Sequence, residues 1–463
     1  MGEPAAESLF RTFVPKPPAP GLGRLALAAG FSTLGGTMCS LTFAYLAFSE
    51  TKSALAAVGV MVGYTLAYAI FAQPGSSLLR PYDRRWVVLG TDAIKLVNYS
   101  ATVVLQILGL LDLPLIIAAS AIGGLTSGAQ YPAWQEILQK VAPEGKLDET
   151  NGLFSSASSI GAAIGALAGG TTLALFGPVV PLAFNVVSYL PLMFETVRLP
   201  EKVGQRSAEE KSGERTPARR VLGSVMRTRL VWLGILFMVL LELIAWPIIS
   251  LLPKVASEFG SSAHIYGILL GAFYFGGVLV AGLLVVSKDR FTYDSIIRFS
   301  LSDIGLALIL LALVGFLPFG SIPSIALAAL VLLGLGIVLG IAGSVLGAIV
   351  QLSADPKIEG SILAFFGAIT LGAGALGGLI EGLVADRLEI WWLPLASGFL
   401  IFIALLYLWS RKAFRVLDEA DPRHEHLIHH HLASTAVVDA PYTATGASGR
   451  SRPRPTGAAP ITS

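Results

Sequence analysis

Apolar residues recur in twelve long stretches along the 463-residue chain, and short polar or turn-forming segments separate them. A helix of about 20 residues crosses the roughly 30 Å hydrocarbon layer of a bilayer, so this pattern indicates membrane spans. The predicted spans cover residues 25–48, 54–79, 86–110, 114–138, 151–176, 180–198, 229–252, 264–287, 295–317, 325–352, 361–385 and 390–410. The sequence therefore predicts an all-α membrane protein with twelve transmembrane helices.

The composition agrees with a membrane protein and excludes several other classes. Charged residues make up 13% of the chain, whereas soluble proteins contain about 25%. The net charge is +2 and no basic patch is interleaved with aromatic residues, so nucleic acid is not an expected partner. Cys39 is the single cysteine, which excludes an internal disulfide.

Lysine and arginine collect on one side of the predicted membrane. With spans alternating in direction, 28 of these residues lie on the side of the two termini, and three lie on the other side. Cytoplasmic segments carry the excess of basic residues in membrane proteins. The distribution therefore predicts that both termini are cytoplasmic.

The chain is organised as two halves around a polar linker. The Asp83–Arg84 pair after span two recurs as Asp289–Arg290 after span eight, and glycines 169–170 recur at 377–378. Such a near-constant offset indicates a duplicated six-helix unit. We therefore expect a cytoplasmic N-terminal segment at 1–24, a six-helix bundle at 25–198, a cytoplasmic linker at 199–228, a second six-helix bundle at 229–410 and a disordered cytoplasmic tail at 411–463.

Twelve spans, a parallel repeat and a central linker resemble the major facilitator superfamily. Residues 131–190, which begin YPAWQEILQKVAPEGKLDETNGLF, resemble spans four to six of its drug:proton antiporter-type family, which includes enterobactin and macrolide exporters. Residues 30–60 and 383–390 are similar to it more loosely. The resemblance covers about residues 25–410 and implies two bundles around a central cavity, lined by spans one, four, seven and ten.

The stretch GAAIGALAGG at 161–170 resembles the span-five motif of these exporters, with Ala166 where the family has proline. Small residues let helix backbones approach closely, as an interface between moving halves requires. Ordinary glycine-mediated packing is the alternative interpretation. The resemblance favours Gly165, Gly169 and Gly170 as part of the moving interface.

The loop GSSLLRPYDRRW at 75–86 takes the place of the superfamily's gating loop between spans two and three. The family's Asp-Arg pair falls on Arg80-Pro81 here, and Asp83, Arg84 and Arg85 follow. The resemblance makes these three residues candidates for gating, with Asp83 as the acid that would bond to a neighbouring helix. Anchoring of the topology by the cations is the alternative.

Two charged residues, Asp92 and Lys95, lie inside span three. Residues three apart share one face of a helix, so the two side chains can neutralise each other. We predict a mutually satisfied structural pair.

Glu242 is a single carboxylate within the apolar span seven, about 20 Å along the helix. An acid at mid-membrane costs about 2.5–3.5 kcal/mol to insert, and span seven offers it no partner. A protonated acid bonded to another helix is one interpretation; a proton- and substrate-binding acid in the cavity is the interpretation we favour. The other candidates for the cavity wall are Trp246, which shares the face of Glu242, then Gln130 and Trp134 on span four, Tyr45 and Tyr274.

Two further positions, Gly36 and Glu381, are relevant to coupling to protons. Many relatives carry an acid in span one, where this chain has Gly36. Glu381 lies within about one turn of the outer end of span eleven, and we expect it to reach water by snorkelling.

The sequence contains no phosphate-binding loop, zinc-protease motif or nucleophile elbow, so an enzyme is not expected. Five histidines lie within HEHLIHHH at 424–431, but no fixed set of metal ligands surrounds them. We therefore expect neither a metal site nor a cofactor, with weak metal binding by the tail as the alternative.

These observations together predict a secondary active transporter, a monomer in the bacterial plasma membrane, that exports a small amphipathic or hydrophobic molecule, drug-like or siderophore-like. Alternating access of the two halves, coupled to protons at Glu242, is the expected mechanism. Two alternatives stay open. The same fold can translocate lysophospholipid or another lipid, or the chain can act as a non-transporting membrane scaffold or sensor through its linker and tail.

Overall fold

The computed structural model describes residues 17, 19, 21–79, 81–204, 218–260, 262–287, 292–317, 321–354, 358–410 and 414. The chain divides into two compact units, Met1–Asp421 and Pro422–Ser463, and the second lies outside the described residues. Linker residues 205–217, the histidines of the tail and the Asp289–Arg290 pair also lie outside them.

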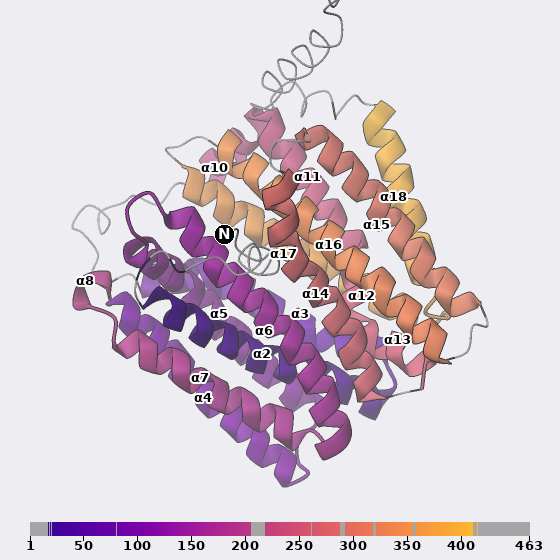
Figure 1. Ribbon diagram of the computed structural model, residues 1–463, viewed down its shortest axis with the longest axis horizontal. Coiled ribbons are helices and arrows are strands. Elements are labelled where there is room, and N and C mark those ends of the chain that lie inside the picture. Colours follow the sequence, from indigo (N-terminus) through magenta and orange to yellow (C-terminus); the bar gives the residue numbers. More distant parts are fainter. Residues whose placement is uncertain are drawn as a thin grey trace, which may run out of the picture. The chain divides into compact units, whose positions relative to one another are not determined.

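The first group of helices follows the predicted spans one to six. It contains α2 (Leu22–Thr51), α3 (Ala54–Leu78), α4 (Arg84–Ile107), α5 (Leu113–Val141), α6 (Leu147–Phe176), α7 (Val179–Val197) and the short α8 (Glu201–Gly204). Helix α2 packs on α6 and α7, and α5 packs on α3 and α4. Figure 1 shows these helices gathered together, coloured from indigo to magenta.

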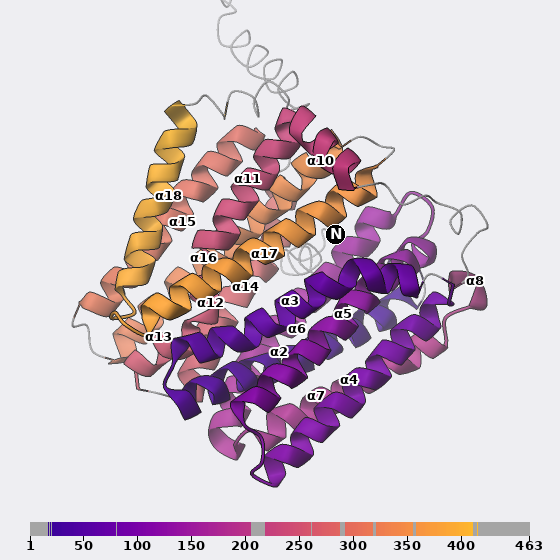
Figure 2. The same ribbon diagram turned by 180° about the vertical axis from the view of Figure 1, so that it is seen from behind.

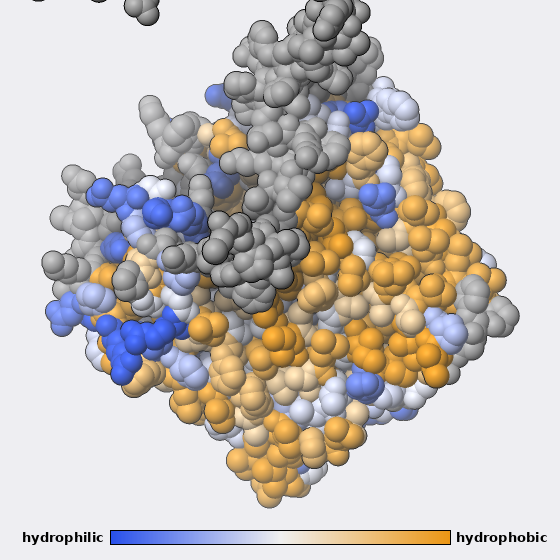
Figure 3. All heavy atoms as spheres, viewed as in Figure 1, coloured by the Kyte–Doolittle hydropathy of each residue, from blue (hydrophilic) through white to orange (hydrophobic). Residues whose placement is uncertain are grey.

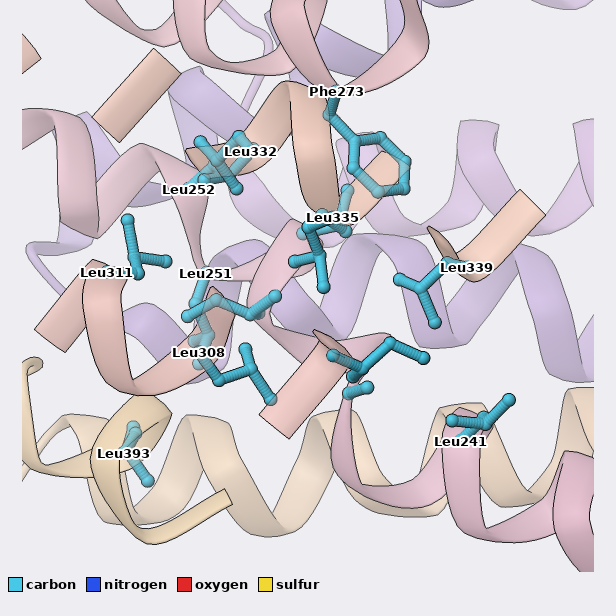
Figure 4. Packing of buried hydrophobic residues seen from close by; sticks show 14 of the residues in the cluster. Leu241, Leu251, Leu252, Phe273, Leu308, Leu311, Leu332, Leu335, Leu339 and Leu393 are labelled. Carbon is cyan, nitrogen blue, oxygen red and sulfur yellow. The ribbon is translucent and has the colours of Figure 1, made fainter. Parts of the chain in front are cut away.

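The second group contains α10 (Ala218–Arg227), α11 (Arg229–Ile244), α12 (Pro247–Ser250), α13 (Leu252–Glu258), α14 (Ala263–Ser287), α15 (Tyr293–Phe316), α16 (Ser321–Ser353), α17 (Glu359–Ala385) and α18 (Trp392–Ser410). Figure 2 shows the same division from behind, with α3 beside α17 where the two groups meet. Leucines of α11, α15 and α16 and Phe273 of α14 converge on one apolar interior in this group, as Figure 4 shows.

Within the described residues, twelve helices are long and apolar enough to cross a membrane, and their positions confirm the twelve predicted spans. Many large apolar side chains face outward, including Leu27 and Ile322, which are 72% and 79% exposed. Figure 3 shows hydrophobic residues over much of the face in view. Soluble monomers rarely expose apolar patches larger than a few hundred Å², so this surface is suited to lipid. With its twelve long apolar helices, the chain is a multi-pass membrane protein.

Span seven differs from the prediction of one continuous helix over 229–252. Helix α11 ends at Ile244, and α12 begins at Pro247. Proline has no N–H to donate to the carbonyl four residues earlier and its ring crowds that carbonyl, so the helix breaks. The Trp246 N–H reaches back to the carbonyl of Leu241 instead, at 3.0 Å. The helix therefore ends two residues after Glu242.

Glycines bring helices of the two groups into backbone contact. A Cβ added at Gly170 of α6 would lie 2.5 Å from the Cα of Gly267 in α14. A Cβ at Gly165 would lie 2.5 Å from the carbonyl oxygen of Leu34 in α2, and one at Gly169 would lie 3.1 Å from the Cα of Met38. Gly165 and Gly169 therefore pack within the first group, whereas Gly170 packs against the second.

Candidate functional site

A cavity of about 500 Å³ lies between the two groups of helices. Helices α2, α3, α4, α5 and α7 contribute wall residues from the first group, and the span-seven segments, α14 and α17 contribute them from the second. Most wall residues are apolar or small, with interspersed serines, threonines and tyrosines. A largely apolar cavity of this volume lies within the size range of small-molecule sites in proteins.

Glu242 lines this cavity, together with Trp246 and Tyr274. Its carboxylate rests over Gly374 of α17, where an added Cβ would lie 2.8 Å from Glu242 Oε2. Glu242 makes no hydrogen bond or ion pair with any other described residue. A half-buried carboxylate in a membrane span therefore faces the cavity without a partner among the described residues.

Aromatic side chains of α14 surround the same end of the cavity. The ring of Trp246 packs edge-on against Phe273 at 5.7 Å between centroids, and Phe273 packs against Tyr274 at 5.6 Å. Tyr266, two turns before Tyr274, also lines the wall.

Lys95 is the other charged residue in the described wall of the cavity, and it forms a network with two buried residues behind it. Its Nζ lies 3.7 Å from Asp92 Oδ1 and donates a hydrogen bond to Gln130 Oε1. Gln130 Nε2 in turn donates to Asp92 Oδ1 at 2.7 Å. The Asp92 side chain is almost fully buried, and its Oδ2 has no hydrogen-bond partner among the described residues. The predicted Asp92–Lys95 pair is present, and Gln130 of α5 forms hydrogen bonds with both of its members.

The structure places two other candidates for the cavity wall elsewhere. Trp134 packs against Phe154 of α6 at 5.8 Å, one turn beyond Gln130 toward the side predicted to be cytoplasmic. Tyr45 packs at the edge of the apolar interior of the second group, while its neighbour Ala44 lines the cavity. One residue turns a helix by about 100°, which explains the difference between Tyr45 and Ala44.

Four cavity tyrosines were not anticipated from the sequence: Tyr64 of α3, Tyr99 of α4, Tyr189 of α7 and Tyr266 of α14. The rings of Tyr99 and Tyr189 stack at 6.1 Å, and the Lys95 ammonium lies 6.0 Å from the Tyr189 centroid. The available signal was a tyrosine in the middle of an apolar span, because its hydroxyl needs a polar neighbour or water there.

The candidate gating residues lie at the start of α4. Asp83 caps this helix by accepting from the Arg85 N–H at 2.8 Å, and it pairs with the Arg85 guanidinium at 2.9 Å. Burial raises the pKa of Asp83, but the hydrogen bonds from Arg85 outweigh it and hold this pKa below its usual value. The Asp83 carboxylate thus binds its own helix, while Arg85 reaches the Leu199 carbonyl after α7. Arg84 pairs with Glu136 of α5 at 2.6 Å.

The prediction that Glu381 reaches water is wrong. Its side chain is buried, with 8% of the residue exposed, and it accepts a hydrogen bond from Ser397 of α18 at 3.1 Å. Helix α18 covers this face of α17, so the carboxylate is enclosed near the helix end. It is not among the residues that line the described cavity.

Comparisons with known proteins agree with this architecture. A family model described as transmembrane secretion effector matches residues 22–440. Among solved structures, the chain is similar to nucleoside transporter NupG, with 15% identity and a TM-score of 0.63, over 85% of this chain and 99% of that one. It is similar to a D-xylose–proton symporter, with 15% identity and a TM-score of 0.65, over 84% and 95% of the two chains. No curated protein gives a significant match.

A third similar structure is a bacterial homologue of the human lysosomal transporter Spinster, in an inward-facing and unoccupied conformation. The identity is 13% and the TM-score 0.62, over 88% of this chain and 99% of that one. These structures share the fold of two helix groups that the chain shows. The family model covers most of the chain, so the chain belongs to the transmembrane secretion effector family, a family of secondary transporters in the major facilitator superfamily.

Proposed function

We propose that the protein exports a small amphipathic or hydrophobic molecule across the bacterial plasma membrane in exchange for protons. The observation that carries this proposal is Glu242, a carboxylate that has no partner in the described part of the chain and lies in a cavity to which both groups of helices contribute. The family description and the resemblance of residues 131–190 to antiporter-type exporters support secretion as the direction.

Alternating access follows from the way the two groups meet. They contact each other through α6 and α14 and through α3 and α17, so a rigid rotation about these pairs opens the cavity to either side. The contact of Gly170 with Gly267 leaves no side chain between the backbones of α6 and α14. Close backbone contact lets helices slide or tilt with few side-chain rearrangements.

Coupling to protons follows from the surroundings of Glu242. An ionised carboxylate without a partner is unfavourable within the membrane, so it needs either a proton or a ligand that compensates its charge. If the substrate and the proton compete for Glu242, the binding of either one shifts the equilibrium between the inward-open and the outward-open state. In the outward-open state a proton from outside replaces the substrate at Glu242. The protonated transporter then returns to the inward-open state, where it releases the proton and binds new substrate.

The experiment is transport in inverted membrane vesicles with an imposed pH gradient, screened over hydrophobic and amphipathic compounds. Glu242→Gln keeps the size of the side chain and removes its titration, so we expect loss of pH-driven transport. Glu381→Gln is the matched control, because it neutralises a buried acid outside the cavity. Undiminished proton-driven transport by Glu242→Gln would contradict the assignment of Glu242.

The same experiment separates the two other candidate functions. A lipid translocator is favoured by the largely apolar wall, and it would move fluorescent lysophospholipid in place of soluble compounds. A scaffold or sensor would move neither. Transport by a chain shortened after residue 410 would exclude a role for the tail in the activity.

A further inference from the structure

We infer that the cavity selects molecules with one positive charge, and that Asp92, which lies behind the wall, sets this preference by neutralising Lys95. The inference rests on the proposed function of the cavity as the transport site. It depends on a balance of charges between two positions on opposite groups of helices, Lys95 on α4 and Glu242 on α11.

The charges of the described wall are few. Lys95 and Glu242 are its only lysine, arginine, aspartate or glutamate residues. Lys95 has its counterion in Asp92, with Gln130 holding both side chains in place. Glu242 has no counterion among the described residues. The Asp92–Lys95 pair contributes no net charge, so the cavity keeps the negative charge of Glu242.

The surroundings of Glu242 suit an organic cation. Trp246, Tyr266 and Tyr274 line the wall with it, and aromatic faces attract ammonium and other organic cations. An amine or quaternary cation would place its charge at the carboxylate and its apolar body against these rings. The volume of about 500 Å³ accommodates a drug-sized molecule.

The binding of an anion at Lys95 is unfavourable. To bind there it must draw the ammonium away from Asp92, whose Oδ2 already lacks a hydrogen-bond partner among the described residues. Asp92 is 1% exposed, so its carboxylate would then be a buried charge without a counterion. Asp92 therefore disfavours the binding of anions, although it does not line the cavity itself. It is a specificity-determining residue that acts through Lys95.

The test uses two probes of matched shape and opposite charge, tetraphenylphosphonium and tetraphenylborate. Their binding to the purified full-length protein is measured in detergent, with protein-free micelles subtracted. We expect the wild type to prefer the cation by at least ten-fold. Glu242→Gln is expected to lose about ten-fold or more in affinity for the cation, Glu242→Asp to retain it, and Glu381→Gln to bind as the wild type.

The role of Asp92 is tested by a gain of binding, which a merely structural residue would not produce. In the double variant Asp92→Asn/Glu242→Gln, Lys95 is the remaining charge of the described wall, and the preference is expected to reverse toward tetraphenylborate. If that variant does not fold, the same probes on Asp92→Asn alone are expected to show a gain in borate affinity. An unchanged preference in a folded variant would overturn the role of Asp92.

The outcomes also separate this inference from the proposed function. Wild-type protein that binds both probes equally, while still exporting a neutral or anionic compound, overturns the charge preference and leaves the exporter intact. Protein that binds the probes as expected but moves nothing in vesicles overturns the exporter and supports the charge preference of the cavity.

Discussion

Asp386, at the end of α17, caps the beginning of α3 by accepting a hydrogen bond from the Ala54 N–H at 2.6 Å. The same carboxylate accepts from the Ser53 hydroxyl at 2.5 Å. The two segments are more than 300 residues apart in the sequence and belong to different groups of helices. Lys254 also donates a hydrogen bond to the Ala385 carbonyl beside them. The capping contact thus joins the two groups on the side predicted to face outward.

We predict that Asp386→Ala weakens closure on this side. Loss of an N-cap costs about 1 kcal/mol, which changes an open–closed equilibrium by about five-fold. The measurement is the labelling rate of Met61→Cys, a cavity position, by an impermeant maleimide from outside, in a Cys39→Ser background. Glu389→Gln is the control, because it lies in the same exposed loop. Equal labelling rates in Asp386→Ala and the control would exclude this role in closure.

A second prediction concerns the unequal exposure of Asp92 and Lys95. Lys95→Met leaves the buried Asp92 without its counterion, and breaking a buried pair in this way costs about 3–5 kcal/mol. Asp92→Asn should cost less, because Lys95 lies at the cavity wall and can be hydrated there. The double variant Asp92→Asn/Lys95→Met should recover much of the loss. Thermal unfolding of all three variants in detergent measures these effects, and additive losses would contradict a coupled pair.

The contact between α6 and α14 gives a third prediction. A Cβ at Gly267 would lie 2.7 Å from the Cα of Gly170 and 2.8 Å from the Ala166 carbonyl oxygen, and backbone atoms cannot move aside easily. Gly267→Ala should therefore cost about 1–3 kcal/mol through overpacking and reduce transport. In the same helix, an added Cβ at Gly277 meets nothing within 4 Å. Gly277→Ala should be neutral or slightly stabilising, and equal transport by the two variants would contradict the prediction.

The ion pair between Arg84 and Glu136 gives a fourth prediction. Arg84 is buried and also donates to the Leu79 carbonyl at 3.0 Å, whereas the Glu136 side chain is 24% exposed. Glu136→Ala leaves the buried Arg84 guanidinium without its counterion, whereas Arg84→Ala leaves a carboxylate that water can reach. Glu136→Ala should therefore lower the unfolding temperature more than Arg84→Ala does. A double-mutant cycle measures the coupling between the two side chains. A coupling energy near zero would mean that the pair does not join α4 to α5.

The sequence predicts the membrane spans well because about 20 apolar residues in a row have few alternatives. It also singles out Glu242 and Trp246, since a carboxylate in such a run stands out and residues at i and i+4 share one face. Pro247 was present as a signal for the break after Ile244, but a proline within a span does not by itself decide between a kink and an interruption.

The remaining differences come from contacts between helices. Gln130 and Trp134 share a face of α5, yet Gln130 bonds to Asp92 while Trp134 packs on Phe154. Spacing along one helix does not say which neighbour covers that face. Glu381 was misplaced for the same reason, because α18 covers it. The cap that Asp386 forms on α3 joins distant parts of the chain, which no local pattern reveals.

The most direct test of the central claim is the movement of protons itself. Purified protein is reconstituted into liposomes that contain a pH-sensitive dye, and an outward gradient of a transported compound is imposed. The account predicts that protons enter as the compound leaves, and that Glu242→Gln abolishes this proton movement while Glu381→Gln retains it. Proton movement of equal size in Glu242→Gln would contradict coupling at this carboxylate.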